Sequence, residues 1–374
     1  MGVHFHAERE SDVSPQEADG ASLRAQTGTA KYRTRQGGAD KPATGEAANW
    51  DSDSEPSATV ARRGRCRHPA RELFQSDYVK KLLRYHFLAV AILPTLGSMV
   101  ALVLALREGV GMLEIVSLLV AYTLTFVGVE VGFHRYFAHR SFQATTALRL
   151  GLAVLGSMAA QGPLVYWTSV HRHHHAFSDQ DGDIHSPHHF GRGALAAFRG
   201  IFHAHMGWMF EHAIPNAGYY VPDLLQDRLI RKVNQHYYAC ILLGLAIPAL
   251  IGWALTGTWM GALKGFLWGG LLRIFLVDHM TWSVNSICHV FGKRRFATRD
   301  GSRNNLWLSI PTFGQSWHNN HHAFPWSARV GLVWREVDLG SLAIRLFQLL
   351  RLASRLKEPS AEMIAARERE LVSS

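Results

Sequence analysis

Cysteine is scarce throughout this sequence, and long apolar runs are missing from its first part. The 374 residues include three cysteines, and none stands in a Cys-x-x-Cys pair. This excludes a disulfide framework and an iron–sulfur centre built from this chain alone. Residues 1–72 are rich in Ala, Gly, Ser and charged residues without apolar periodicity, which predicts a disordered tail. The formal net charge is +10, but no nucleic-acid-binding motif accompanies it, so we expect no nucleic-acid partner.

Four long apolar runs follow this tail, and each is long enough to cross a bilayer as a helix. They cover residues 87–106, 115–133, 238–255 and 265–287. Short turns join the first run to the second and the third to the fourth, which predicts two hairpins. The fourth run contains Arg273 and Asp278, so we expect it to face protein more than lipid. Residues 150–160 are apolar but too short to span and predict an interfacial or re-entrant segment, and residues 338–356 predict an amphipathic surface helix.

The distribution of basic residues predicts the orientation of these runs. Arginines and lysines cluster before the first run, from Arg62 to Arg84, and after the fourth, from Lys293 to Arg303. The turns inside the hairpins have no such clusters, so the positive-inside rule places both termini and the segment between the hairpins in the cytoplasm. The expected fold is an all-α integral membrane protein with four transmembrane helices in two hairpins and a cytoplasmic helical cap. We assign the membrane domain to residues 73–359 and a C-terminal tail to residues 360–374.

Histidine is unusually abundant, with 22 residues in the chain. Those with metal-ligand spacing are His134 with His139, His171 with His174 and His175, and His318 with His321 and His322. In the two His-x-x-His-His groups, offsets of three and four place the imidazoles on one face of a helix. The offset of five in the first group corresponds to about 140° on an α-helix. These two side chains can therefore bind one ion only if the helix bends, and otherwise serve two ions or two sides of a cluster.

A structural and a metal-binding interpretation of these histidines compete. A lone buried histidine is usually structural, but repeated ligand spacing beside membrane spans favours a metal centre. The set is larger than one tetrahedral zinc site requires, and it contains no cysteine. Imidazole suits iron, copper, nickel and zinc alike. Of these metals, only one that changes its oxidation state can activate dioxygen.

The sequence around each group resembles the histidine boxes of the membrane acyl desaturases, a family that includes the acyl-CoA delta-9 desaturases. The three matching stretches are HRYFAHRSF from His134, HRHHH from His171 and WHNNHHAFP from Trp317. Residues Asn285–His289 are similar to the NSxxH segment of the family. Residues Asp183–Pro187 and His205–Trp208 resemble its DPHSP and HxGW landmarks. The resemblance covers roughly residues 76–359.

This resemblance implies a centre of two iron ions with nine histidine ligands and an asparagine that reaches a metal through water. The implied residues are His134, His139, His171, His174, His175, His289, His318, His321, His322 and Asn285. No catalytic residue is implied beyond the metal centre. The implied reaction is the oxygen-dependent insertion of a cis double bond into a long-chain saturated fatty acyl group. The boxes favour the delta-9 position and acyl-CoA is the expected substrate, while acyl-carrier protein and membrane lipid stay open as carriers of the acyl group.

The resemblance also implies partners and substrate contacts. No flavin, NAD or haem motif is visible, so electrons are expected from a separate ferredoxin or b-type cytochrome with its reductase. The bilayer and a long-chain acyl substrate are the other expected partners. Trp167 and Trp282 match positions that line the acyl tunnel, although both suit interfacial anchoring as well. Arg172 and Arg192 match positions that meet the phosphates of the acyl carrier, although exposed arginines are usually only solvated.

Three positions depart from the family pattern, and two other functions compete. Gln315 stands where the third box normally has glutamate, Gln143 replaces a common lysine, and Glu130 stands where threonine is frequent. Glu130 lies one turn before His134 and either orients that ring or pairs with Arg273. A related hydroxylase usually carries a shorter His-x-x-x-His spacing in the first box. A metal transporter needs polar residues along its spans, whereas these runs are almost continuously apolar.

Overall fold

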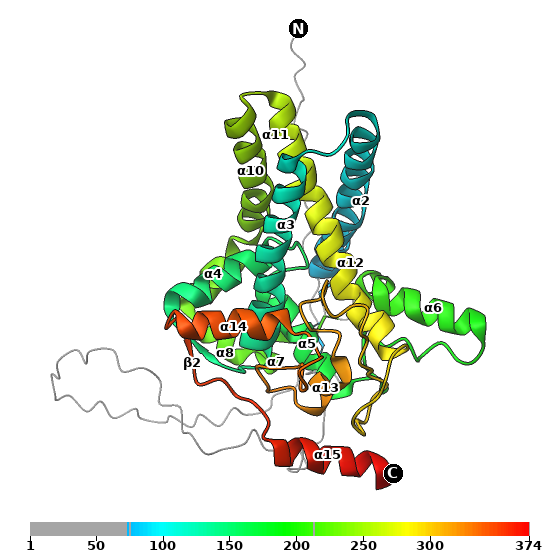
Figure 1. Ribbon diagram of the computed structural model, residues 1–374. Coiled ribbons are helices and arrows are strands. Elements are labelled where there is room, and N and C mark those ends of the chain that lie inside the picture. The colour runs from blue at the N-terminus through cyan, green and yellow to red at the C-terminus, as the bar shows by residue number, and fades with distance from the viewer. Residues whose placement is uncertain (1–72, 75, 212–213, 374) are drawn as a thin grey trace, which may run out of the picture. The chain divides into compact units, whose positions relative to one another are not determined.

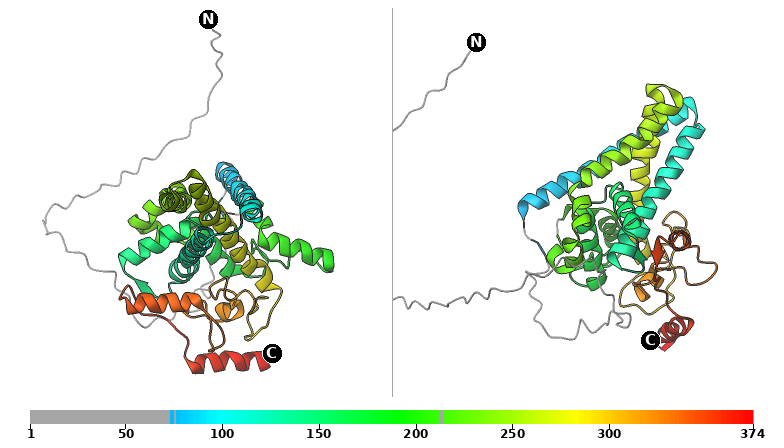
Figure 2. Two further views of the ribbon diagram at one scale, coloured as in Figure 1. Left: turned by 45° about the horizontal axis from the view of Figure 1, so that its top comes forward. Right: turned by 90° about the vertical axis from the view of Figure 1, so that its left-hand side faces the viewer.

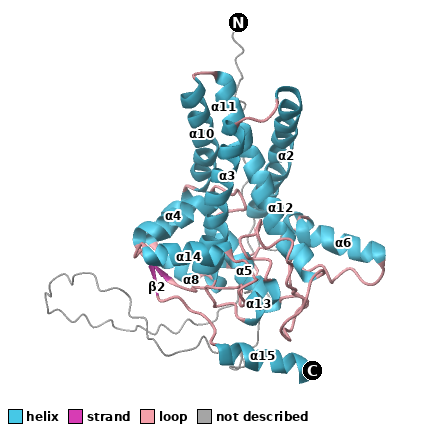
Figure 3. Cartoon of the chain, in the orientation of Figure 1, coloured by secondary structure: helices cyan, strands magenta, loops and turns pink. Residues whose placement is uncertain are grey.

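The computed structural model describes residues 73–74, 76–211 and 214–373, so the tail predicted over residues 1–72 lies outside the described part. The described part is almost wholly helical (Figure 3). Its strands β1 (Gln143–Ala144) and β2 (Ala353–Ser354) form one short antiparallel pair, with Gln143 opposite Ser354. The predicted all-α class is confirmed.

Four long apolar helices form two hairpins whose turns lie at the same end of the molecule (Figure 1). The first hairpin consists of α2 (Asp77–Glu108) and of α3 (Met112–Phe126), which continues directly into the π-helix η2 (Val127–Ala138). The second consists of α10 (Tyr237–Thr256) and a composite helix made of α11 (Trp259–Gly265), the π-helix η4 (Phe266–Leu272), α12 (Arg273–Ser286) and the 3-10 turn η5 (Ile287–His289). The predicted membrane protein with four spans is confirmed, and each helix extends beyond its apolar run at both ends.

Local sequence sets where the spans begin and turn. The hydroxyl of Ser76 accepts the Val79 amide at 3.4 Å and caps the first turn of α2. At the end of α10, Gly257 has φ +66°, a conformation that glycine adopts readily, and its amide donates to the Trp253 carbonyl at 2.7 Å. Thr258 then caps α11, because its hydroxyl accepts the Gly261 amide at 3.1 Å.

The fourth span is the central one. Its η4 segment contacts α2, α3 and α10, and 44% of its apolar window is buried, against 22–28% in the other spans. Arg273 and Asp278 are each 1% exposed, which confirms that this span faces protein. Arg273 donates to the carbonyl oxygens of Met158, Gly244 and Gly269. Backbone carbonyls, and not Glu130, therefore stabilise its charge.

The cap forms at the end of the spans opposite the hairpin turns (Figures 1 and 2). Its helices α4 (Thr146–Ser157) and α5 (Leu164–Phe177) both pack against η2. The contact with α4 is so close that a Cβ atom on Gly128 would lie 2.1 Å from the amide nitrogen of Gly156. The remaining cap elements are α6 (Ala194–His205), η3 (Gly207–Phe210), α7 (Ala217–Tyr220), α8 (Pro222–Gln226), α9 (Arg228–Gln235), α13 (His318–Ala323), α14 (Leu339–Leu349) and α15 (Ala361–Ser373).

Three of these helices correspond to segments discussed from the sequence. The apolar stretch 150–160 falls mostly in α4, which is too short to span a membrane. The amphipathic stretch 338–356 contains α14, where Ile344 is buried and Leu342 and Leu346 are exposed. The segment assigned to a C-terminal tail contains α15, and Arg295 Nε donates to Glu368 of this helix at 2.8 Å.

Candidate metal centre

Two groups of histidines converge at the cap end of the spans. In each group the candidate ligand atoms lie within 4.8 Å of one another. The first group consists of His134, His139, His171, His175 and His321, and the second of His174, His289, His318 and His322. Both groups take rings from α5 and α13, and the structure thus brings together all nine histidines named from the sequence.

A π-helix explains how His134 and His139 enter the same group. The His139 amide donates to the His134 carbonyl at 3.1 Å, which is the i to i+5 hydrogen bond of a π-helix. Residues five apart therefore lie almost above one another, and the two ring centroids are 4.9 Å apart. The helix therefore departs from α-helical geometry at this point, and both side chains belong to one group.

The Nε2 atoms of the first group form a continuous chain of short contacts. The Nε2 atoms of His139 and His171 lie 2.7 Å apart, and those of His171 and His175 lie 3.1 Å apart. The Nε2 atom of His321 lies 2.9 Å from that of His175 and 3.1 Å from that of His134. Nitrogen atoms that each lie about 2.0–2.1 Å from one ion are roughly 3 Å from their neighbours. The observed spacing fits ligands of one ion.

The second group shows the same arrangement with four rings. The Nε2 atom of His318 lies 3.0 Å from the Nε2 atoms of both His289 and His322. The ring centroid of His174 lies 5.2 Å from that of His289 and 5.3 Å from that of His322. Its Nε2 atom is buried and has no hydrogen-bond partner among the described residues. A buried imidazole nitrogen without a partner is expected where a metal ion binds.

Carboxylates contact the opposite nitrogen of four of these rings. The Nδ1 atom of His174 lies 3.0 Å from Asp183, and that of His134 lies 2.9 Å from Glu130. The corresponding distances are 2.7 Å from His289 to Asp179 and 2.8 Å from His322 to Asp300. A carboxylate on Nδ1 fixes the ring orientation and leaves the Nε2 lone pair for a metal, as in carboxylate–histidine–metal triads.

The charge state of the rings also suits a cation. Burial lowers the pKa of His139, His171 and His175 well below the ordinary histidine value, and neighbouring imidazoles lower it further. Burial lowers the pKa of His318 and His321 in the same way. Neutral rings whose lone pairs converge repel one another unless a cation lies between them. The donor set, entirely imidazole nitrogen, suits iron, copper, nickel or zinc.

The carboxylates of Asp300 and Asp183 stay ionised because of the imidazole rings that they contact. Burial by itself raises the pKa of Asp300, but the charge of His322 and its hydrogen bond lower it below the ordinary aspartate value. Burial opposes ionisation of Asp183 in the same way, and His174 and His185 lower its pKa. Each ionised carboxylate can therefore accept a hydrogen bond from the Nδ1–H group of the ring beside it.

A chain of buried ion pairs supports the first group, and only Glu130 among its members was predicted from the sequence. The guanidinium of Arg135 donates to Glu130 at 2.8 Å and to Asp338 at 2.7 Å. Glu130 thus contacts both Arg135 and His134. Of the two alternatives proposed for Glu130, it orients the His134 ring and does not pair with Arg273. Asp338 lies some two hundred residues along the chain, and no sequence motif pointed to it.

A narrow cavity of about 40 Å³ lies next to the first group. His171, Asn285, Trp167 and Trp282 all line it, as does Gln315. Trp167 stacks on His171 with the ring planes at 18°, and its indole N–H donates to Gln161 at 3.0 Å. The two tryptophans therefore lie where the sequence placed them, beside the candidate metal ligands. Asn285 belongs to neither histidine group but shares this cavity with His171.

The two arginines named as carrier contacts differ in their surroundings. Arg172 donates to both carboxylate oxygens of Asp223, at 2.8 and 3.0 Å, and to the carbonyl oxygens of Phe137, Ala138 and Tyr220. These bonds give Arg172 a structural role between η2, α5 and α8, and they leave little capacity for an external phosphate. Arg192 is exposed in the loop before α6.

Two other histidines near the second box lie outside both groups. His173 is 3% exposed and packs against Phe177 and Tyr220. It is a buried structural residue that does not face solvent. His185 lies next to Asp183 and His174, and burial lowers its pKa to about 3. It helps to surround the ring of His174.

Comparison with known proteins gives concordant matches. A family model described as fatty acid desaturase matches residues 111–362. A hex-5-enoyl-[acyl-carrier protein] acetylenase of Moorena producens (strain JHB) is 45% identical over 78% of this chain and 92% of its own length. Delta-9 acyl-lipid desaturase 1 of Arabidopsis thaliana is 35% identical over 65% of this chain and 74% of its own length. An sn-1 stearoyl-lipid 9-desaturase of Anabaena variabilis is 36% identical over 65% of this chain and 83% of its own length.

Proposed function

This chain belongs to the fatty acid desaturase family and is an oxidoreductase of the membrane, and from that premise we propose that it inserts a cis double bond into a long-chain saturated fatty acyl group. The overall reaction removes two hydrogen atoms from adjacent methylene carbons and reduces dioxygen to two molecules of water. It consumes two electrons and two protons besides those taken from the acyl chain.

The convergence of nine buried or half-buried histidines into two groups is the observation that supports this proposal. We assign one iron ion to each group, held by the five rings of the first and the four rings of the second, with Asn285 close to the first. When bound, the iron pair would supply the oxidising power to break an unactivated C–H bond, which no side chain can do. The four carboxylates on Nδ1 atoms hold the rings in the orientation that this requires.

The cavity beside the first group gives the acyl chain its position. Trp167 and Trp282 border the space next to His171, so they would hold a methylene chain there and exclude water. A second cavity of about 450 Å³ shares Tyr166 with this one and has no charged lining residue among those described. An apolar entrance of this kind suits an acyl chain that arrives from the bilayer or from a hydrophobic carrier site.

The carrier of the acyl group is the finer part of the proposal. The histidine boxes favour the delta-9 position, and acyl-CoA is the expected substrate. The relatives' names bring forward acyl-lipid and acyl-carrier-protein substrates as alternatives. The relative named as an acetylenase also supports a second candidate reaction, the removal of two further hydrogen atoms from an existing alkene. A lipid hydroxylase would give an alcohol instead.

Two further parts concern electrons and sidedness. The electrons would come from a separate ferredoxin or b-type cytochrome with its reductase. The positive-inside rule places both termini and the metal centre in the cytoplasm. The location of the histidine groups at the cap end, on the side where the C-terminus lies, supports this orientation (Figure 1).

Expression in an auxotroph for unsaturated fatty acids tests the function. We expect growth without added oleate and the appearance of a cis-monounsaturated acyl chain by mass spectrometry. The purified protein with saturated acyl-CoA, acyl-carrier protein or phospholipid then identifies the carrier. His318→Ala is the matched inactive variant. An alcohol or an alkyne as the main product, or growth supported equally by His318→Ala, would contradict the proposal.

A further inference from the structure

A large pocket opens on the cap next to Trp317, the residue before α13. Its volume is about 970 Å³. Its walls come from residues 291–295, 304–307, 333 and 335–336, together with the buried Trp317 and with Glu368 of α15. Figure 1 shows α15 at the end of the cap away from the hairpin turns. We call this cavity the basic pocket, after its lining residues Lys293, Arg294, Arg295 and Arg335.

Hydrogen bonds connect the wall of the basic pocket to the candidate metal ligands. Lys293 and Asn304 exchange backbone hydrogen bonds of 3.0 and 2.8 Å. The side-chain oxygen of Asn304 accepts the amides of Asn319, at 3.0 Å, and Asn320, at 3.1 Å, in the first turn of α13. This turn begins with His318. The wall is therefore a rigid extension of the backbone that holds one of the second group's rings.

Trp317 connects the lining of the basic pocket to the second histidine group along the chain, because it lines the pocket and is the residue before α13. Its side chain is 6% exposed, and its indole N–H donates to the Val337 carbonyl at 2.8 Å. It immediately precedes His318, whose Nε2 atom lies 3.0 Å from that of His289. Next to the lining residue Asn304, the Arg303 amide donates to the Cys288 carbonyl at 2.7 Å, one residue before His289. Covalent bonds and short hydrogen bonds thus connect the wall of the basic pocket to the second histidine group.

The charges of the basic pocket are unbalanced. Lys293, Arg294 and Arg335 are exposed. Among the described lining residues, the carboxylates are Glu336 and Glu368, and Arg295 contacts both. Arg295 therefore pairs with both acidic groups, and the three exposed cations have no further carboxylate among the described lining residues. Such a field attracts an acidic partner and raises its association rate.

Large exposed aromatic side chains accompany these cations. Trp307 is 87% exposed and Phe291 is 56% exposed in the pocket wall, and Trp334 next to Arg335 is 95% exposed. Tryptophan and arginine are enriched in the parts of protein interfaces that contribute most to affinity. Aromatic side chains exposed to this extent beside cations are therefore typical of a protein-binding surface.

We propose that the basic pocket is the docking site of an acidic electron-carrier protein and that electrons enter through Trp317 and His318 to the second histidine group. This inference rests on the proposed desaturase function. Each reduced carrier donates one electron and leaves oxidised, so two carrier molecules supply the two electrons that the reduction of dioxygen consumes. The protons come from water. The pocket lies beside α15, so a soluble protein reaches it more directly than a lipid head group does.

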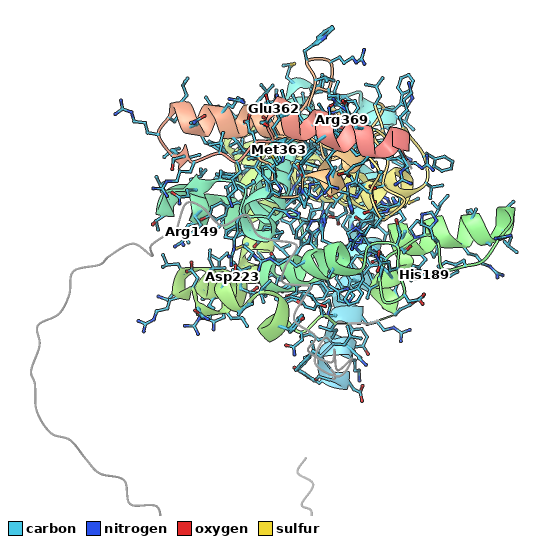
Figure 4. The ribbon with its side chains drawn as sticks, turned by 90° about the horizontal axis from the view of Figure 1, so that it is seen from below. Arg149, His189, Asp223, Glu362, Met363 and Arg369 are labelled. Atoms are coloured by element: carbon cyan, nitrogen blue, oxygen red, sulfur yellow. The ribbon has the colours of Figure 1, made fainter. Side chains whose placement is uncertain are left out.

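Charge reversal at two exposed positions tests the docking site. The test variant is Lys293→Glu with Arg335→Glu, because neither residue makes a hydrogen bond or ion pair recorded among the described residues through its side chain. The matched control is Arg228→Glu with Arg231→Glu on α9, which is exposed and gives the same change in net charge. Seen from the cap end, Asp223 of the adjacent α8 lies apart from Glu362 and Arg369 of α15 (Figure 4). The two variants therefore alter different sides of the cap.

Three measurements use the full-length, iron-loaded protein in lipid nanodiscs. The first is the affinity of an acidic [2Fe–2S] ferredoxin and of soluble cytochrome b5. The second is the KM for each carrier in alkene formation with its reductase and NADPH. The third is alkene formation with dithionite and no carrier. We expect a roughly tenfold higher KM and weaker carrier binding for the Lys293→Glu/Arg335→Glu variant, a reduced dependence on ionic strength, and unchanged product with dithionite.

The outcomes separate this inference from the proposed function. Equal carrier affinity and KM in the two double variants would overturn the docking site. Equal loss of product with dithionite would show that the substitutions damage the centre itself, which also overturns it. If the wild-type protein makes no alkene even with dithionite, the proposed function fails, while the carrier affinities still decide the docking site.

Discussion

At the scale of single residues, the candidate metal centre depends on pairs formed by a ring and a carboxylate. His322 illustrates the arrangement, because its Nε2 atom faces His318 while its Nδ1 atom lies 2.8 Å from Asp300. The carboxyl oxygen Oδ1 of Asp300 in turn accepts the Ser302 amide at 3.0 Å and the Thr298 hydroxyl at 3.0 Å. The loop around Asp300 therefore determines where the imidazole points.

Asp300→Asn should lower metal affinity without removing a ligand. The amide has no negative charge, so it stabilises the metal-bound ring less, and loss of such a partner typically costs roughly 10–100-fold in metal affinity. We expect less iron per chain after purification by plasma mass spectrometry and weaker Fe²⁺ binding by titration. Asp181→Asn is the control, because Asp181 is an exposed aspartate of the loop after the second box. The same iron content in both variants would contradict the prediction.

The sequence predicted the rings well and their partners poorly, for a physical reason. The rings of α5 and α13 recur at helical offsets, and this pattern is visible in one stretch of chain. Asp179 and Asp300 reach their rings from loops, and their positions depend on tertiary packing. For Arg172 the motif was a poor guide. The motif suggested a contact with the acyl carrier, whereas in the fold this side chain donates hydrogen bonds to Asp223 and to three backbone carbonyls.

At the scale of elements, η2 is the segment on which the first histidine group depends. Its π-helical geometry places His134 and His139 on one side, and α4 holds it through the contact of Gly128 with Gly156. The length and composition of the apolar runs were sufficient to predict the spans. The π-helix was not predictable from apolar periodicity, and the histidine offset left open whether the helix bends around one ion or the two rings serve two ions or two sides of a cluster.

Gly128→Ala should disrupt this crossing. The added Cβ would lie 2.1 Å from the Gly156 amide nitrogen and 2.4 Å from the Leu155 carbonyl carbon, both backbone atoms that cannot move aside. Overpacking of this kind costs at least about 1–3 kcal/mol, so we expect a lower melting temperature and less bound iron. Gly151→Ala is the control, because nothing lies within 4 Å of a Cβ there, and alanine in an exposed helix should stabilise by about 0.5–1 kcal/mol. Equal stability of the two variants, measured by thermal unfolding in detergent, would show that α4 and η2 do not require this close contact.

At the scale of the whole molecule, four separated stretches of chain must meet before either histidine group exists. Two stretches are the ends of spans, at η2 and η5, and two are cap helices, α5 and α13. Box motifs indicated that these stretches meet but not which rings share an ion. The division into five and four follows from the fold, because His174 faces η5 while His171 and His175 face η2.

Removal of iron should therefore destabilise the entire cap. Without a cation, converging lone pairs in two buried groups repel one another, and the four stretches lose their common ligand. A ligand that binds only the folded state stabilises it by about 2.7 kcal/mol at one hundred times its Kd, so protein treated with dithionite and a ferrous chelator should melt at a lower temperature. Titration with Fe²⁺ should restore the melting temperature and saturate near two equivalents per chain, one for each group, whereas Mg²⁺, which prefers oxygen ligands, should restore nothing. His318→Ala, which removes one ring of the second group, should saturate near one equivalent. Identical melting of the iron-loaded and iron-free protein would mean that the histidines are held by packing alone, and the two groups would then be structural.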